Sequence, residues 1–263
     1  MDIIKTIILG IIEGITEWLP VSSTGHLILA EEFMKLKNVS GNFWEVFLVV
    51  IQLGAIMAVA AAFFKKLNPF SKQKTIREKN STYRLWFKII VGCLPAGIIG
   101  FLFDDIIDKT FYNFITVAIM LIIYGILFIF VETRNEAKTP KITNLEQLDY
   151  KTALIIGGFQ VLAIIPGTSR YVAAEFSFFL AIPVMFGASL LKIVKYIAEH
   201  GMFSAFEVFL IFLGMLTAFI VSIIAIKFLM KYIKKNDFKA FGYYRIVLGV
   251  ILIIYWLLSS KPA

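Results

Sequence analysis

Two carboxylates, three hydroxyl groups and an imidazole lie close together near the start of the chain, in an otherwise apolar segment. Glu13 and Glu17 are four residues apart, so on a helix they share one face. Pro20, the run Ser22-Ser23-Thr24 and His26 follow. Charged groups at membrane depth cost about 2.5–3.5 kcal/mol each on insertion scales, and they usually face a cavity with a function. We call residues 13–26 the N-terminal motif.

The N-terminal motif has groups that could bind a phosphate, hold a metal ion or activate a hydroxyl. Pro20 ends the first helix, and Ser22, Ser23 and Thr24 are of the types that cap a new helix, whose free N–H groups attract an anion. Glu13 and Glu17 offer hard oxygen ligands for Mg²⁺ or Ca²⁺. The alternative is a carboxyl pair that shares a proton.

Ser23 and His26 supply the remaining parts of a hydrolytic site. A nucleophile, a base and an orienting carboxylate are the parts of hydroxyl activation, so Ser23 is a candidate nucleophile or phosphate ligand and His26 a candidate base. A lone histidine near a helix start is, however, more often structural, and this alternative stays open at the level of the residues.

The rest of the composition indicates a membrane protein. Of the 263 residues, 59% are hydrophobic and 17% charged, against about 25% charged in soluble domains. The net charge of +8 does not indicate nucleic acid binding, because the basic residues lie in loops between apolar segments. Six segments approach or exceed the length that spans a bilayer: residues 43–64, 85–103, 111–131, 173–194, 206–230 and 241–258. We therefore predict an all-α polytopic membrane protein with one integral domain over residues 1–263.

Loop charge and two shorter apolar segments predict the topology. Residues 65–84 carry seven Lys or Arg and one Glu, and residues 227–239 carry five Lys and one Asp, so both loops are expected in the cytoplasm. Residues 3–19 and 152–165 are too short to span and end at Pro20 and Pro166. Short segments broken by Pro in corresponding halves predict a site formed by re-entrant half-helices.

An internal similarity supports two repeats, about residues 1–103 and 111–258. Gly10-x-x-Glu13 leads to Pro20-x-x-Ser23, and Gly157-x-x-Gln160 leads to Pro166-x-x-Ser169. If the second copy enters from the cytoplasmic side, the repeats are inverted and their polar ends meet near the membrane middle. The alternative is chance similarity between two apolar stretches.

The second copy ends in Pro166-Gly-Thr-Ser-Arg170, which we call the second motif. The planar guanidinium of Arg170 matches phosphate oxygens, and Ser169 is expected beside it. Gln160 is polar at membrane depth and either lines the site or bonds to another helix. The alternative for Arg170 is that it only extends to the membrane surface.

Together the two motifs strongly resemble those of the undecaprenyl-diphosphate phosphatases, the bacitracin-resistance membrane proteins of bacteria. The resemblance rests on Glu13-x-x-x-Glu17 with Pro20-Val-Ser-Ser-Thr-Gly-His26, then on the second motif, and it covers nearly the whole chain, including Glu175-Phe-Ser-Phe-Phe-Leu-Ala-Ile-Pro. It implies hydrolysis of a prenyl diphosphate lipid to its monophosphate in the bacterial cytoplasmic membrane, with the site open to the outside. The partners are then that substrate and membrane lipid, with no nucleic acid, and a homodimer is an open option.

The resemblance also implies roles for single residues. Glu13 and Glu17 become the metal or acid–base pair, with Mg²⁺ or Ca²⁺ as the cofactor. The same comparison makes Ser23 the nucleophile and His26 its base. It also implies that Arg170 and Ser169 bind the phosphate. Ser22, Thr24 and Gln160 complete the expected substrate-binding set.

The chain departs from the family pattern after Arg170. There the family continues into the second half of a re-entrant pair, whereas here Tyr171-Val-Ala-Ala-Glu175 looks like the start of the next span. A segment of about four helical turns is missing. A catalytically dead paralogue is therefore one alternative to the phosphatase. The inverted repeats give the other, a transporter of a prenyl phosphate lipid or small anion.

Overall fold

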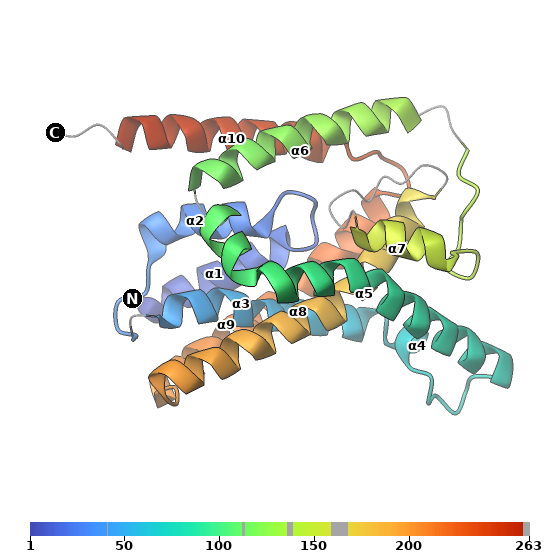
Figure 1. Cartoon of the computed structure of the whole chain (residues 1–263), viewed down its shortest axis with the longest axis horizontal. Coiled ribbons are helices and arrows are strands. Elements are labelled where there is room, and N and C mark those ends of the chain that lie inside the picture. Colours follow the sequence, from blue (N-terminus) through green and yellow to red (C-terminus); the bar gives the residue numbers. More distant parts are fainter. Residues whose placement is uncertain (41, 112–113, 136–138, 159–167, 260–263) are drawn as a thin grey trace.

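The computed structural model describes residues 1–40, 42–111, 114–135, 139–158 and 168–259. The regular secondary structure of these residues is helical, apart from one isolated β-bridge between Ile142 and Thr168 (Figure 1). The helices are α1 Asp2–Thr16, α2 Ser23–Met34, α3 Phe43–Ala62, α4 Phe64–Leu67, α5 Ile76–Phe111, α6 Phe114–Asn135, α7 Tyr150–Gly158, α8 Arg170–His200, α9 Ala205–Tyr232 and α10 Lys239–Ser259.

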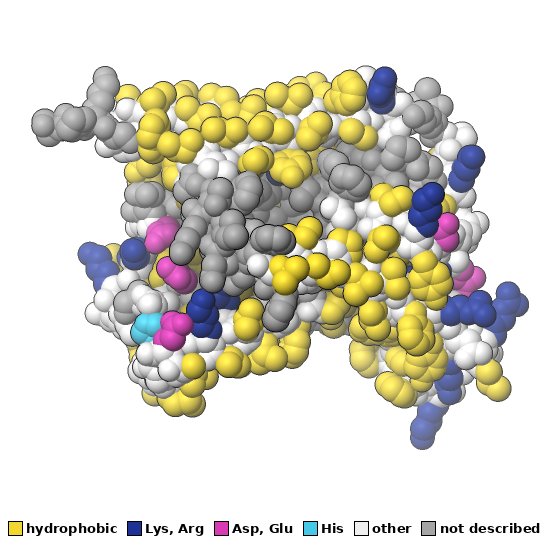
Figure 2. Space-filling view, viewed as in Figure 1, with side chains coloured by type: hydrophobic (Ala, Val, Ile, Leu, Met, Phe, Trp, Pro, Cys, Tyr) yellow, Lys and Arg dark blue, Asp and Glu magenta, His cyan; other side chains and the backbone are white. Residues whose placement is uncertain are grey.

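Six of these helices are long and apolar enough to cross a membrane, namely α3, α5 over Ile76–Gly100, α6, α8, α9 and α10. They match the six segments predicted from the sequence and confirm the all-α polytopic architecture. Their outward faces carry large apolar side chains, and Figure 2 shows an apolar surface along the pair α6 and α10 at the top. Such a surface is stable against lipid, where apolar side chains need no protein cover.

The chain has two distinct ends along the spans. The start of α1 and the end of α10 lie at one end, at left in Figure 1, and α4 lies at the other; we call the first the terminal end. At the terminal end, Asp2 at the start of α1 accepts hydrogen bonds from Asn38, and Ser40 before α3 donates to Glu207 at the start of α9. At the α4 end, Lys66 pairs with Glu175 near the start of α8. The α4 end also carries both basic loops.

The packing of α1 recurs in α7. α1 begins at the terminal end and packs along α9, where Gly10 approaches the backbone of Gly214. α7 begins at the α4 end and packs along α5, where Gly157 approaches the backbone of Gly92. Two short helices thus enter from opposite ends and use a glycine at the equivalent place. α6 and α10 lie outside this pattern and pack mainly on each other.

Gly157 gives a direct test of the contact between α7 and α5. A Cβ atom there would lie 1.6 Å from the carbonyl oxygen of Gly92, whereas a Cβ atom at the neighbouring Gly158 meets nothing within 4 Å. We expect Gly157→Ala to lower the free energy of unfolding by about 1–3 kcal/mol, as overpacking does. Gly158→Ala, the matched control, should change it by less than about 1 kcal/mol. Thermal unfolding in detergent measures both, and equal effects would contradict this packing.

The start of α8 resolves the topology around the second motif. Ser169 N donates to Ile142 O at 2.8 Å, and α8 then runs from the α4 end to His200 near the start of α9. Downstream spans therefore keep the orientation that the basic loop at residues 227–239 predicts. Residues 159–167, which contain the first part of the second motif, lie outside the described residues.

Candidate active site

The turn between α1 and α2, residues 17–22, carries Glu17 and Ser22, and the other polar groups of the N-terminal motif lie on the two helices that it joins. Ser22 caps α2 by accepting a hydrogen bond from Gly25 N at 3.3 Å, which confirms the helix start predicted from the hydroxyl run. Ser22 has φ +74° and ψ +99°, a conformation that is costly for a residue with a side chain. Backbone strain of this kind is typical of functional sites, where the surrounding contacts hold it in place.

The depth of this turn follows from the packing of α1. Gly10 lies beside Gly214 and Gly14 beside Ala218, so α1 runs parallel to α9. The end of α1 at Thr16 therefore lies near the middle of α9, which itself crosses the membrane. In a membrane that α9 spans, the turn would lie near the membrane middle.

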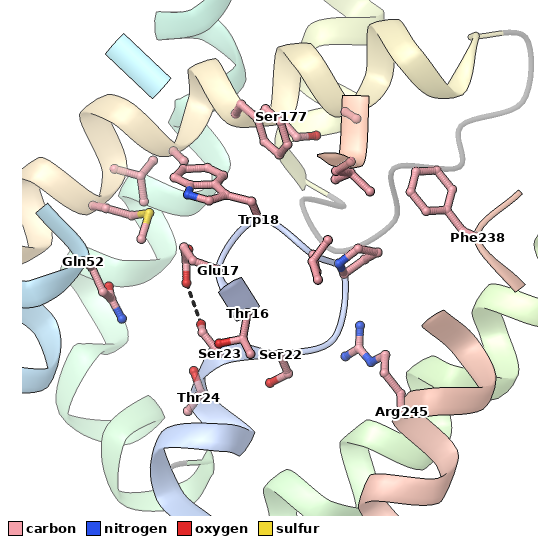
Figure 3. A pocket seen from close by; sticks show the side chains of 18 residues that line it. Thr16, Glu17, Trp18, Ser22, Ser23, Thr24, Gln52, Ser177, Phe238 and Arg245 are labelled. Atoms are coloured by element: carbon pink, nitrogen blue, oxygen red, sulfur yellow. Dashed lines mark hydrogen bonds between the residues drawn. The ribbon is translucent and has the colours of Figure 1, made fainter. Parts of the chain in front are cut away.

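A cavity of about 410 Å³ opens beside this turn (Figure 3). One wall comes from the turn and the start of α2, and the others from α3, α8, the end of α9 and α10. Its polar lining consists of Thr16, Glu17, Ser22, Ser23, Thr24, Gln52, Ser177 and Arg245. Apolar side chains such as Trp18, Phe178 and Phe238 complete the walls. A mostly apolar pocket with a few convergent polar groups is typical of a ligand site.

Glu17 and Ser23 form the reactive pair of this cavity. Ser23 Oγ donates a hydrogen bond to Glu17 Oε2 at 2.5 Å, and Figure 3 shows both side chains facing the cavity. A hydroxyl bonded to a carboxylate can pass its proton to it, which makes the oxygen a better nucleophile. The geometry therefore pairs Ser23 with Glu17 and not with His26.

Glu13 lies behind this pair and is completely buried. Neither of its carboxylate oxygens has a hydrogen-bond partner among the described residues, and its carboxyl group interacts electrostatically with that of Glu17. Two buried carboxyl groups this close need a shared proton or a cation to offset their repulsion. Glu13 does not line the cavity itself, so it would act through Glu17 or a bound ion.

His26 is directed away from the cavity. Its Nδ1 donates to the carbonyl oxygen of Ser22 at 2.7 Å, since a carbonyl can only accept. In the neutral ring, Nε2 then accepts from the hydroxyl of Tyr244 at 2.7 Å, and the two rings stack. His26 therefore holds the strained backbone of Ser22 and ties it to α10. The structure places the predicted base as a positioning residue, because α2 turns its side chain toward α10.

Arg245 is the cation of this cavity, and sequence reasoning missed it. Its residue is 6% exposed, its guanidinium lies over the rings of Tyr124 and Phe128, and its Nε has no hydrogen-bond partner. No carboxylate among the described residues forms an ion pair with it. In Figure 3 the guanidinium faces the cavity, with Ser22 and Ser23 between it and Glu17. An arginine inside the span predicted for residues 241–258 was the available signal.

Arg170 does not reach this cavity, which corrects the prediction that the two motifs share one site. Its Nε donates to both carboxylate oxygens of Glu132 at 2.8 and 3.0 Å, and Nη2 donates to Oε2 at 2.5 Å. Glu132 is fully buried at the end of α6 and also accepts from Phe238 N. The reason is the short connection to α8, which leaves Arg170 at the α4 end.

Some of the remaining predicted residues line the cavity and others lie elsewhere. Ser22, Ser23 and Thr24 line the cavity, whereas Ser169 caps α8 by accepting from Val172 N at 3.3 Å. Gln160 lies outside the described residues. Gln52, whose role the sequence left open, is a lining residue.

Comparisons with known proteins show the family of this chain. The family described as bacitracin resistance protein BacA matches residues 6–251. An undecaprenyl-diphosphatase of Enterococcus faecalis is 60% identical, over 97% of this chain and 98% of the relative. Relatives with the same name from Acetivibrio thermocellus and Desulfitobacterium hafniense are 57% and 56% identical, and each alignment covers at least 96% of both chains.

The alignments also bear on the length of this chain. They extend over 270 to 272 positions, which exceeds the 263 residues present here. The relatives therefore contain residues without a counterpart in this chain. This agrees with a missing segment.

Proposed function

Because the chain belongs to the family of the bacitracin resistance protein BacA, we propose that it is a membrane phosphatase that hydrolyses undecaprenyl diphosphate. The products are undecaprenyl phosphate and inorganic phosphate, so the reaction recycles the lipid carrier of cell-wall synthesis and confers bacitracin resistance. One observation supports this best: the buried Arg245, which has no ion pair with any carboxylate that the structure describes, faces a carboxylate–hydroxyl pair across one cavity.

Three polar residues of the cavity, Arg245, Glu17 and Ser23, take part in this reaction. Arg245 binds the phosphate oxygens and offsets the charge that develops on them, which is the main requirement in phosphoryl transfer. Glu17 removes the proton from Ser23 Oγ, or from a water in its place, as the oxygen attacks the terminal phosphorus. The bond from that phosphorus to the bridging oxygen breaks, and undecaprenyl phosphate leaves. When water attacks, inorganic phosphate forms in this step. When Ser23 attacks, the phosphoryl group is first held on Ser23 Oγ, and a water that gives its proton to Glu17 then hydrolyses this ester to inorganic phosphate and restores the hydroxyl. The apolar walls and the surrounding lipid accommodate the prenyl chain.

Glu13 and Glu17 are suited to a divalent cation. The buried carboxylate oxygens of Glu13 have no hydrogen-bond partner in the described part of the chain, and hard oxygen ligands between carboxylates and substrate phosphates suit Mg²⁺ or Ca²⁺. When bound, such an ion supplies electrostatic stabilisation of the phosphate oxygens. His26 holds the turn, so that Ser22 and Ser23 keep their positions toward the substrate.

We further propose that this site serves the outer face of the bacterial cytoplasmic membrane. The charge rule puts the α4 end, with its basic loops, in the cytoplasm. The termini then lie outside, and α1 and α2 enter the membrane from that side.

Phosphate release from undecaprenyl diphosphate by the purified chain in detergent tests the proposal. We expect many turnovers per protein molecule with Mg²⁺, and at least about a tenfold lower rate after removal of divalent ions with EDTA, since a metal contributes several kcal/mol to such reactions. Lipid movement across vesicles without any phosphate release would instead indicate a transporter. A folded protein with neither activity would indicate a dead paralogue.

A further inference from the structure

A second cleft of about 970 Å³ lies at the α4 end of the molecule, away from the cavity of Arg245. Its walls come from α4, the loop after it, the first turns of α5, residues 143–146 and the start of α8. Figure 2 shows Lys and Arg side chains gathered around this part of the molecule, at lower right. The basic residues that line the cleft are Lys65, Lys66, Lys74, Arg77, Arg84 and Lys88.

The acidic residues of this cleft do not neutralise its cations. Glu175 pairs with Lys66 at 2.5 Å. Glu78 accepts from the backbone and hydroxyl of Thr75 at the start of α5, and Glu146 accepts from Ser81. Apart from Lys66, none of the cleft's basic residues has an ion pair with a described carboxylate.

Lys88 shows that the positive charge of the cleft includes a buried ammonium group as well as exposed side chains. Its residue is 8% exposed, and its ammonium donates to the carbonyl oxygens of Leu145 and Glu146, each at 3.3 Å. Lys74 is likewise held, by Thr82 Oγ1 at 2.7 Å and Lys66 O at 3.2 Å. The carboxylates of Glu146 and Asp149 act on this ammonium without a hydrogen bond, and the like charge of Arg84 opposes them, so an anion bound in the cleft would stabilise it further.

Two other lining residues suit a phosphate. Asn80 and Asn144 line the cleft with side-chain amides, whereas the hydroxyls of Ser81, Thr82 and Thr143 already donate to Glu146, Glu78 O and Gln147. Phosphate oxygens accept hydrogen bonds from such amides and pair with Lys and Arg. At the membrane surface, basic clusters of this kind also attract the phosphates of anionic lipids.

We propose that this cleft is a phosphate-binding site, separate from the catalytic cavity. The phosphate comes from the headgroup of an anionic phospholipid in the adjacent leaflet or from a free phosphate ion. The proposal depends on the cleft alone and does not require the phosphatase activity.

The experiment removes three charges that hold nothing else in place. Lys65, Arg77 and Arg84 are exposed, and no hydrogen bond or ion pair of their side chains involves a described residue. We expect the triple variant Lys65→Gln/Arg77→Gln/Arg84→Gln to fold normally. Its affinity for the phosphate should fall about fivefold for each charge, or about a hundredfold in all.

The matched control removes the same charge from the same end of the molecule. Lys72, Lys231 and Lys235 are exposed and do not line the cleft. The triple variant Lys72→Gln/Lys231→Gln/Lys235→Gln should weaken binding by less than about threefold, because only distant, screened charges are lost. Binding that falls equally in both variants would overturn the proposal and leave only a diffuse basic surface.

Two probes on the purified full chain identify the source of the phosphate. Equilibrium dialysis measures inorganic phosphate, and native mass spectrometry in neutral detergent measures retained phosphatidylglycerol against phosphatidylcholine. If the cleft variant binds phosphatidylglycerol more weakly but inorganic phosphate as the wild type does, the ligand is a lipid headgroup. If it binds inorganic phosphate more weakly, with or without a loss of phosphatidylglycerol binding, the ligand is a free anion. No binding of either probe to the wild type would overturn the proposal.

Discussion

Replacing Glu17 with Gln is expected to lower kcat for phosphate release from undecaprenyl diphosphate by about a thousandfold. The amide keeps the size of the side chain and can still accept a hydrogen bond from Ser23 Oγ, which lies 2.5 Å from Glu17 Oε2. It cannot take the proton of the attacking hydroxyl, and loss of a positioned base lowers rates by about 10²–10⁴-fold. Steady-state phosphate release, normalised to folded protein by gel filtration, measures the effect.

Glu31→Gln is the matched control for this experiment. Glu31 lies on α2 beyond the cavity and forms an exposed pair with Lys35 at 3.3 Å. Such surface pairs contribute about 0–1 kcal/mol, so kcat should stay within about twofold. A similar loss of kcat in both variants would show that kcat depends on the negative charge of this region and not on the Glu17 carboxylate itself.

Ser23→Ala then identifies the attacking oxygen. If Ser23 is the nucleophile, its removal should cost as much as Glu17→Gln, and the double variant should lose little more, because residues that act as one unit are not additive. If water attacks and Ser23 only binds phosphate, the loss should be about tenfold, the equivalent of one hydrogen bond. An undiminished rate in Ser23→Ala would contradict the pair assigned from the cavity.

Local sequence signals predicted the features that depend on local physics. Six apolar segments became spanning helices because backbone groups in lipid must be satisfied within each segment. The turn after Glu17 and the capping of α2 by Ser22 follow from residue types a few positions apart. These contacts within the N-terminal motif depend on nothing distant.

Distant pairing explains what the sequence did not reveal. The partner of Arg170 is Glu132 at the end of another helix, and no local pattern connects the two. His26 was expected near the hydroxyls because it follows them closely. On α2, however, its side chain meets Tyr244, a residue of the last helix. Arg245 is the reverse case. An arginine inside a predicted span is by itself a local signal of a functional residue, and no distant partner is needed to notice it.

Arg245→Met should lower kcat/KM by about 10²–10³-fold, the effect of losing one donor that stabilises the charge of a transition state. The guanidinium is buried and aimed at the cavity, and its Nε has no partner, so its loss breaks no ion pair with a described residue. The unfolding temperature should therefore change little. Arg245→Lys keeps the charge without the planar fork and should recover only part of the activity.

Arg170→Met should give the opposite result, with a loss of stability and nearly unchanged kcat per folded molecule. It would leave the carboxylate of Glu132 buried and uncompensated, which costs about 3 kcal/mol in the free energy of unfolding. Adding Glu132→Gln should restore part of that loss, because the charge that Arg170 neutralised is then gone. If instead Arg170→Met stops turnover at an unchanged unfolding temperature, Arg170 serves the substrate and the division of roles between the two arginines is wrong.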